Sequence, residues 1–596
     1  MFARKVKSAD FTASLQRFVD LHRDCASRAK HLKLALDALC IQDKRQFMED
    51  YSFETFHLVD ELLLQADLTQ TTQSVLEAES ALWALEQLLC FAPKLVGSGW
   101  QKHAIEYVLK KALFPHNLLA VRKIALRLFL IWYQSLAIFN NTNSQLDTVF
   151  QCLLPNFPLR NNLSTENILH NYCQSAATAA GPGPIRNAPL VSNQNNVAPN
   201  AKEKAQLLQV YLDKFLEYCT RETIRIEWDD ENIRLECAKF ILDRVIVLYI
   251  YEIFPDIEAN GVDIYGGWEG NEGLADVRDT ADPIVIARYW LIRWMASVAL
   301  TTNNDLAVAG QVLYRKALFS SRKATNTLLT LLKEAVMLPL PCSNVIHKLS
   351  FTINFTILKF VFSLISSWLL QRNLPPFIDE GITIDTLSLL LIHFLTSFFH
   401  SPYLSLAGER LSSAISLTQS LLQITRDLSS PSTSLQKPLS TRVWCELIRS
   451  LAEGIRTVTS RSDAYGRATS GALSQNLLGV IVFVRAISGV AVDEKVWDDV
   501  LAVFQSGCWI QMIEQWSRVV DSVTRALILN LFEVDIAPCD QMASHQVVKR
   551  MKSNETVSAP DGANIEFSEE IRSENSSVED DNAQITSVIQ VINYKF

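Results

Sequence analysis

The sequence predicts an all-α fold, built as an irregular helical array of the HEAT or armadillo kind. Apolar residues recur at steps of three and four through most of the chain, whereas the strict alternation typical of strands is scarce. Of the 596 residues, 48% are hydrophobic and 20% are charged, so the chain can bury a large core. No fixed repeat period is present in the sequence, so we expect an irregular solenoid.

The individual helices follow from this periodicity. In the segment LLAVRKIALRLFLIWYQSL (118–136), Val121, Ile124 and Leu128 share one face while Lys123 lies on another, as an amphipathic helix requires. Segment 282–300 opens with Asp282 as N-cap and Pro283 at the first helical position. The same pattern predicts helices over 11–47, 53–66, 74–92, 101–114, 202–226, 231–253, 305–337, 405–427, 441–459 and 474–488.

Changes in composition divide the chain into five segments. We expect an N-terminal helical array over 1–155, a flexible linker or long loop over 156–201, a helical segment over 202–300, a second array over 301–540 and a disordered acidic tail over 541–596. The linker is rich in Ala, Pro, Asn and Gly, which favours loops. The tail carries nine acids between Glu555 and Asp581 against the single base Arg572.

Charge and cysteine content restrict the class of protein. The net charge of -9 argues against a dedicated nucleic-acid binder. The eleven cysteines are scattered and form no CxxC pair, which indicates buried free thiols in a reducing compartment. The start MFARKVKSADFTAS contains no apolar stretch of the secretory kind. We therefore expect the cytoplasm, with the nucleus as a second compartment.

Two apolar runs, 351–370 and 387–399, raise the question of a membrane hairpin. The first is long enough to cross a bilayer, but its polar residues, among them Thr352, Thr356 and Lys359, recur on one helical stripe. The second run is shorter than a span requires and contains His393. We expect a buried helical hairpin and no stable membrane insertion, with a membrane-associated adaptor as the alternative.

Motifs for catalysis or ligand binding are missing from the sequence. The Gly-rich acidic loop 259–281 has neither phosphate-binding glycine pattern, and its acids would repel phosphate. No histidine lies in an H-E-x-x-H motif, and no G-x-S-x-G elbow is present. The sequence therefore predicts no catalytic residue, no cofactor, no cofactor-binding residue and no metal ligand, and His393 is interpreted as a core or interface residue.

The stretch 492–520 is the most suggestive of chemistry, because the pair Asp498–Asp499 lies among Trp497, Trp509 and Trp516. A metal site, an acid–base pair or a sugar site would use such residues. The helical pattern favours another interpretation, in which Asp493 caps a helix from Glu494 and the two acids face solvent near Lys495 and Ala502. We expect a helical hairpin whose buried residues are Val496, Trp497, Val500, Leu501, Val503 and Phe504 on the first helix and Trp509, Met512, Ile513, Trp516, Val519 and Val520 on the second.

Several segments, taken in order, resemble a known family. Residues 27–56, WQKHAIEYVLKKAL (100–113) and VRKIALRLFLIWYQSL (121–136) are similar to the start of the alpha subunit of the Ral GTPase-activating protein complex, a relative of tuberin. Residues 282–300 and 495–536 resemble later parts of the same N-terminal region. These segments are packing signatures and contain no catalytic motif.

The resemblance implies a scaffold that associates with the beta subunit of that complex. It also implies a Ral-type small GTPase as a partner, but only through a C-terminal Rap/Ran-GAP-type domain that supplies a catalytic asparagine. Nothing in this sequence resembles that domain, so no asparagine receives the role. We therefore expect a non-catalytic scaffold, encoded as an N-terminal fragment, an isoform or an early-ending gene model.

Overall fold

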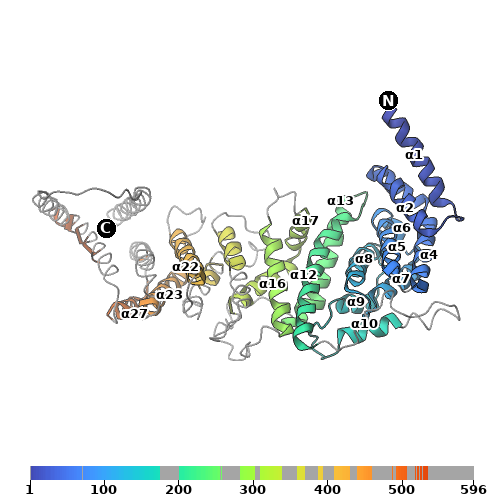
Figure 1. Ribbon diagram of the computed structural model, residues 1–596. Coiled ribbons are helices and arrows are strands. Elements are labelled where there is room, and N and C mark those ends of the chain that lie inside the picture. The colour runs from blue at the N-terminus through green and yellow to red at the C-terminus, as the bar shows by residue number, and fades with distance from the viewer. Residues whose placement is uncertain are drawn as a thin grey trace, which may run out of the picture. The chain divides into compact units, whose positions relative to one another are not determined.

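The computed structural model describes residues 2–69, 72–174, 200–255, 257, 282–301, 309–337, 359–369, 385, 387–392, 409–429, 439–459, 486, 492–505 and single positions between 517 and 534. Over these ranges the regular secondary structure is helical, and no strand occurs (Figure 1). The predicted all-α class is therefore confirmed. The HEAT or armadillo repeat type stays a prediction.

The chain forms two compact units. Unit 1 comprises Met1–Leu364 with Pro375–Gly381, and unit 2 comprises Ile365–Leu374 with Ile382–Phe596. The five predicted segments stay a prediction, although helix α10 (Thr165–Gln174) lies inside the range 156–201 that we expected to be a linker or loop. Residues 175–199 lie outside the described part of the chain.

Unit 1 begins with five helices, three of which are joined by a buried arginine. They are α1 (Phe2–Val19), α2 (Cys25–Asp37), α3 (Ile41–Asp50), α4 (Ser52–Thr69) and α5 (Thr72–Phe91). Arg28 of α2 is fully buried; it donates to the Phe18 carbonyl at 2.9 Å and also contacts Glu61 Oε2. Because one guanidinium satisfies both acceptors, it joins α2 to the end of α1 and to α4.

Helix α8 is the central element of unit 1. It follows α6 (Pro93–Gly97) and α7 (Lys102–Leu113), spans Leu119–Ile138 and packs against α5, α6, α7, α12 and α13. Its Trp132 and Tyr133 are fully buried. A Cβ on Gly97 would lie 2.6 Å from the Ser135 carbonyl oxygen, so only glycine lets α6 approach α8 this closely.

The next helices are α9 (Ser144–Cys152), α10 and α12 (Ala201–Arg225), followed by α13 (Glu231–Val245), which continues without a break through a π-helical turn, η1 (Ile246–Ile250), into α14 (Tyr251–Ile253). A π-helical turn interrupts the regular backbone hydrogen bonds of an α-helix, so its carbonyl oxygens can accept from other donors. The side-chain Nε2 of Gln151 donates to the Leu248 carbonyl at 3.1 Å. The buried Tyr249 hydroxyl donates to the Phe150 carbonyl. The turn is thus held by side-chain bonds to α9.

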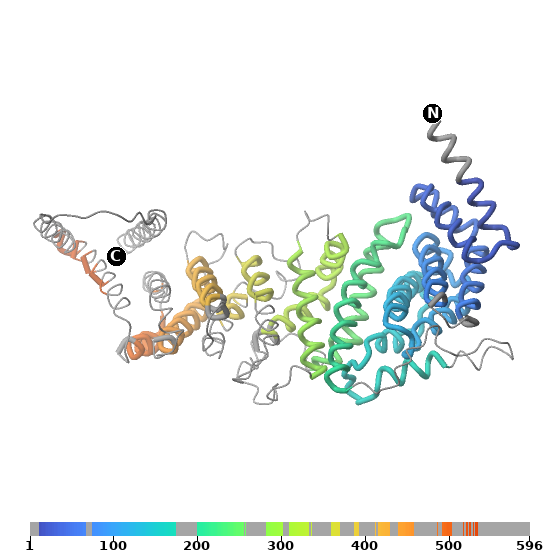
Figure 2. Tube along the Cα trace, viewed as in Figure 1, coloured from blue at the N-terminus to red at the C-terminus, as the bar shows by residue number. Residues whose placement is uncertain are grey.

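Unit 1 continues with α16 (Pro283–Leu300), α17 (Ala309–Leu318) and α18 (Arg322–Met337). Helix α12 packs against both α8 and α16, so it lies between the earlier and the later helices of unit 1 (Figures 1 and 2). Asp282 caps α16 as predicted, since its Oδ1 accepts from the Ile284 amide at 2.9 Å. A Cβ on Gly310 would lie 2.4 Å from the Thr220 carbonyl oxygen, so the backbones of α17 and α12 come into close contact here.

One described helix is long and apolar enough to cross a membrane, and it is α16. Half of this apolar stretch is buried, because α16 packs on α12, α17 and α18. This burial is typical of a core helix. Of the two runs that raised this question in the sequence, only residues 359–369 and 387–392 are described, and both stretches are helical. The rest of the expected hairpin lies outside the described residues.

Unit 2 contains α22 (Glu409–Leu428), α23 (Thr441–Thr459) and α27 (Glu494–Gln505). Helix α23 buries Val443, Leu447, Leu451 and Ile455, which are spaced by four and form one apolar stripe. Helix α27 packs on α23. This contact positions the acid pair that the sequence singled out.

Candidate functional site

The acid pair of α27 faces solvent. Asp498 and Asp499 are both exposed, as predicted, and the Asp499 side chain is 65% exposed. Its Oδ2 lies 4.0 Å from the Arg449 Nε of α23, which is a loose surface ion pair. Two exposed carboxylates on the polar side of a surface helix are typical of a solvated helix face.

The apolar face of α27 is narrower than predicted. Val496, Val500 and Val503 are buried, and Trp497 is half-buried. Leu501 is 56% exposed, so its predicted burial is wrong. The three valines lie at positions i, i+4 and i+7, whereas Leu501 is rotated by about 100° from Val500, beyond the strip that α23 covers.

The second half of the expected hairpin is described only at a few positions. Cys508, Trp509 and Trp516 lie outside the described residues. Val520 is 47% exposed, so its predicted place in a buried stripe is wrong. The observed packing partner of α27 is α23, which precedes it in the chain.

The remaining sequence candidates also fall outside the described residues, namely the Gly-rich loop 259–281 and His393. In the part of the chain that the structure covers, no group of three or more His, Cys, Asp or Glu side chains is arranged to hold a metal ion. The predicted lack of catalytic, cofactor and metal residues stays a prediction.

The structure reveals a buried charge cluster that sequence reasoning missed. It comprises Glu86 of α5, Arg127 of α8, and Glu222 and Arg225 of α12, and we call it the α5–α8–α12 cluster. Arg127 Nη2 donates to Glu86 Oε2 at 2.5 Å, and its Nε lies 4.0 Å from Glu222 Oε1. Arg225 Nη1 donates to Glu222 Oε2 at 2.7 Å and also contacts Glu86 Oε1.

Burial governs the electrostatics of this cluster. Glu86 is 3% exposed and Glu222 is fully buried. Burial raises the pKa of the Glu222 carboxyl, while Arg225 and Arg127 beside it oppose part of that rise. Arg221 of α12 adds a third guanidinium, because its Nε lies 3.7 Å from Glu222 Oε1. Both carboxylates are thus compensated, and the cluster joins three helices. Because both carboxylates are occupied by arginines, the arrangement serves packing better than catalysis.

A second charged contact fixes the corner between α12 and α13. The Glu227 amide donates to the Cys90 carbonyl at 2.9 Å, so this corner touches the end of α5. Asp229 contacts both Arg45 of α3 and Lys94 of α6. Arg234 Nη2 lies 2.9 Å from Glu227 Oε2. These contacts connect α3, α5 and α6 to helices more than a hundred residues later in the chain.

Only one weak signal in the sequence points to the α5–α8–α12 cluster. Glu86 is the only charged residue in the run SALWALEQLLCF (80–91), where a periodic apolar pattern leaves no clear polar face. A lone acid in such a run suggests a buried partner. The partner itself could not be found from the sequence, because Glu222 is remote in the chain and lies on the mixed, highly charged helix α12.

Two family models match the chain. Residues 2–236 match the RALGAPA1 N-terminal domain, and residues 410–534 match the RALGAPB N-terminal domain. The first match contains the α5–α8–α12 cluster and lies in unit 1, and the second contains α23 and α27 and lies in unit 2. No solved structure matches the chain.

Several curated relatives show the same likeness. Ral GTPase-activating protein subunit alpha-1 of Homo sapiens is 25% identical over 330 residues, which cover 50% of this chain and 15% of the relative. The protein of the same name from Sus scrofa is 25% identical over 330 residues, covering 50% of this chain and 92% of the relative. Probable Rho GTPase-activating protein CG5521 of Drosophila melanogaster is 31% identical over 159 residues, covering 26% of this chain and 8% of the relative.

The chain thus spans a small part of the human and fly relatives and nearly all of the pig relative. The predicted resemblance to the alpha-subunit N-terminal region is confirmed by these matches. Residues 2–236 of this chain are similar to the RALGAPA1 N-terminal domain, whose family model they match.

Proposed function

We propose that the chain is a non-catalytic scaffold of a Ral-type GTPase-activating complex and that it associates with the beta subunit of that complex. The observation that carries the proposal is the pair of family matches: residues 2–236 to an alpha-subunit N-terminal domain and 410–534 to a beta-subunit N-terminal domain. Both kinds of subunit are named for one activating complex, so a chain related to both is expected to take part in its assembly.

The positions of the acidic side chains in the structure support this role. Its buried acids are held by arginines: Glu86 by Arg127 of α8, and Glu222 by Arg225 of its own helix. Its exposed acid pair lies on a surface helix. Helical arrays of this kind offer extended surfaces for protein partners. In this proposal a Ral-type GTPase contacts the complex through a Rap/Ran-GAP-type domain, and the helices described here act as the scaffold. The proposed location is the cytoplasm, with the nucleus as a second compartment.

The test separates binding from catalysis. Purified full chain carrying an affinity tag is mixed with purified Ral GTPase-activating protein beta subunit, and co-elution is measured by size-exclusion chromatography. In parallel, hydrolysis of GTP by Ral is measured with the chain alone. We expect a stable complex with the beta subunit and no acceleration of hydrolysis.

The matched positive control is the whole human alpha-1 subunit in both assays, so that an inactive beta subunit or GTPase preparation is recognised. A chain that fails to co-elute while the human subunit succeeds would overturn the scaffold proposal. Accelerated hydrolysis of GTP by the chain alone would overturn its non-catalytic part.

A further inference from the structure

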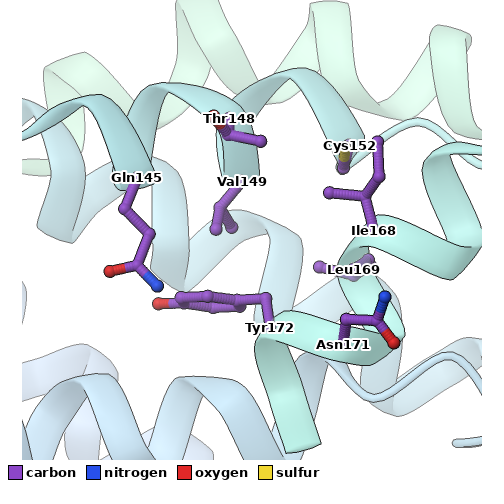
Figure 3. A pocket seen from close by; sticks show the side chains of 8 residues that line it. All are labelled: Gln145, Thr148, Val149, Cys152, Ile168, Leu169, Asn171 and Tyr172. Atoms are coloured by element: carbon purple, nitrogen blue, oxygen red, sulfur yellow. The ribbon is translucent and has the colours of Figure 1, made fainter. Parts of the chain in front are cut away.

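A pocket of about 290 Å³ opens between α9 and α10 in unit 1. Figure 3 shows that α9 and α10 supply its walls, with the Tyr172 ring along one edge. The Gln145 and Asn171 amides lie toward opposite ends of the pocket in this view. The volume is at the lower end of what small-ligand sites offer, so the pocket suits one side chain better than a large molecule.

The floor and the rim of the pocket differ in polarity. The floor is apolar and buried, formed by Val149, Cys152, Leu169 and the ring of Tyr172. The rim consists of exposed polar side chains, Gln145, Thr148 and Asn171. An apolar floor under a polar, uncharged rim is the pattern that holds an apolar group and orients what is attached to it.

The pocket is electrically neutral. Burial raises the pKa of the Cys152 thiol to about 12, so the thiol stays protonated at neutral pH. The Tyr172 hydroxyl donates to Glu106 Oε1 at 2.9 Å, and Lys110 balances that carboxylate at 3.1 Å. A charged ligand would therefore lose its hydration without gaining an opposite charge.

The acids on the two lining helices are also balanced. On α9, Asp147 accepts from the Tyr133 hydroxyl and lies 3.5 Å from Arg244 Nε. On α10, Glu166 lies 3.7 Å from Arg122 Nη2. No charge on either helix is thus available to attract an ionic group into the pocket.

We propose that this pocket binds one large, uncharged apolar side chain of a partner polypeptide. The Gln145 and Asn171 amides, which can both donate and accept, hydrogen-bond to the peptide groups on either side of that residue. The proposal builds on the scaffold function, because it names one docking point for a partner on the alpha-like unit.

The probe is N-acetyl-leucine methylamide, which carries the side chain and both peptide groups. It is titrated into the full chain labelled at Ile, Leu and Val methyl groups, and the shifts of the Val149, Ile168 and Leu169 methyl signals are followed by nuclear magnetic resonance. We expect saturable shifts at these methyls with a Kd of roughly 1 mM, the range typical of a ligand with so few atoms.

Variants test whether the shifts come from the pocket. Thr148→Trp places an indole at the exposed rim, where it covers the opening without disturbing the core, and we expect it to weaken binding at least 10-fold. Ser144→Trp is the matched control, because Ser144 is exposed on the same helix but does not line the pocket, and it is expected to leave the Kd unchanged. Asn171→Ala removes one rim amide and is expected to weaken binding about 3-fold.

Two further probes define the ligand class. 4-Methyl-1-pentanol has the leucine side-chain shape without peptide groups, and N-acetyl-aspartate methylamide has the peptide groups with a charged side chain; both are expected to bind at least 10-fold more weakly. Absence of saturable shifts, equal binding of either probe, or full binding by Thr148→Trp would overturn the proposal. Co-elution with the beta subunit is measured separately, so failure of the pocket is distinguishable from failure of the scaffold function.

Discussion

Acidic residues lie beside apolar residues at two helix contacts in this chain. They are buried at one contact and exposed at the other. In the α5–α8–α12 cluster, Glu86 and Glu222 are buried. Glu86 meets Arg127 of α8, and Glu222 meets Arg225 of its own helix and, at 4.0 Å, Arg127. At the contact of α23 with α27, Asp498 and Asp499 remain exposed, and the apolar contact is made by valines. The difference shows that local sequence does not decide where an acid lies.

The physical reason is the cost of removing a charge from water. A buried carboxylate is tolerated only where a fixed opposite charge and hydrogen bonds replace its hydration. Arg127 and Arg225 converge on Glu86 and Glu222, whereas Arg449 approaches Asp499 only to 4.0 Å at the surface. The more conspicuous acid pair in the sequence is therefore the less important one for packing.

The largest effect is expected for Glu222→Ala. The substitution removes a buried carboxylate that pairs with Arg225 and Arg127. We expect the free energy of local unfolding of α5, α8 and α12 to fall by about 3–5 kcal/mol. Hydrogen exchange resolved by mass spectrometry measures this helix by helix, which is appropriate for a chain of two units. A loss below about 1 kcal/mol would contradict the structural role of the cluster.

The matched control is Glu217→Ala on the same helix, whose side chain is 41% exposed and pairs with Lys214 at 2.7 Å. We expect a loss of at most about 1 kcal/mol, because surface ion pairs contribute little. The pH dependence should also differ. A hydrogen bond from Lys214 lowers the pKa of Glu217, so its contribution is lost as the pH falls through that pKa. Burial raises the pKa of Glu222, so its titration favours the folded state at low pH and opposes it as the pH rises.

An intermediate effect is expected at the contact of α27 with α23. Val500→Ala removes two buried carbons, which costs about 2 kcal/mol of opening free energy in α27 when the cavity is included. Asp499→Ala, one position earlier and exposed, should change the same quantity by less than about 0.5 kcal/mol. Equal effects of the two substitutions would show that the acid pair supports packing and would remove the contrast with the buried cluster.

The smallest effect is expected for Gly310→Ala, which tests the crowding beside the buried cluster. Alanine normally stabilises a helix interior by about 1 kcal/mol relative to glycine. Here the added Cβ would lie 2.4 Å from the Thr220 carbonyl oxygen, so α17 must move away from α12. Overpacking of about 1–3 kcal/mol should outweigh the helical gain, leaving a net loss of about 1 kcal/mol in hydrogen exchange of α12 and α17. A gain in stability would show that the two helices adjust freely.

Much of the helical structure could be predicted from periodicity and capping. The predicted range 441–459 coincides with α23, and Asp282 and Asp493 cap their helices as expected. Prediction failed at Leu501 and Val520, which share an apolar pattern with buried neighbours yet are exposed. A helical pattern gives the direction of an apolar face but not its width, because the width depends on how much of the helix a neighbour covers.

The pocket between α9 and α10 could not be predicted from the sequence, for a related reason. Tyr172 and Asn171 lie inside the range 156–201 that we expected to be a linker or long loop. Helix α10 forms there because its Leu169 and Tyr172 bury themselves against earlier helices. Short helices of this kind gain most of their stability from tertiary packing.

By itself the sequence determined the all-α class, most helix positions and the kinship with the alpha-subunit N-terminal domain, because these depend on local periodicity and residue order. Only the tertiary structure decided which acids are buried, how wide each apolar face is, and where α9 and α10 leave a neutral pocket. Those features depend on side chains that are remote in the chain, such as Glu86 and Arg225, reaching the same point in space. Electrostatic pairing and close packing act over a few ångströms, and only the folded chain sets those distances.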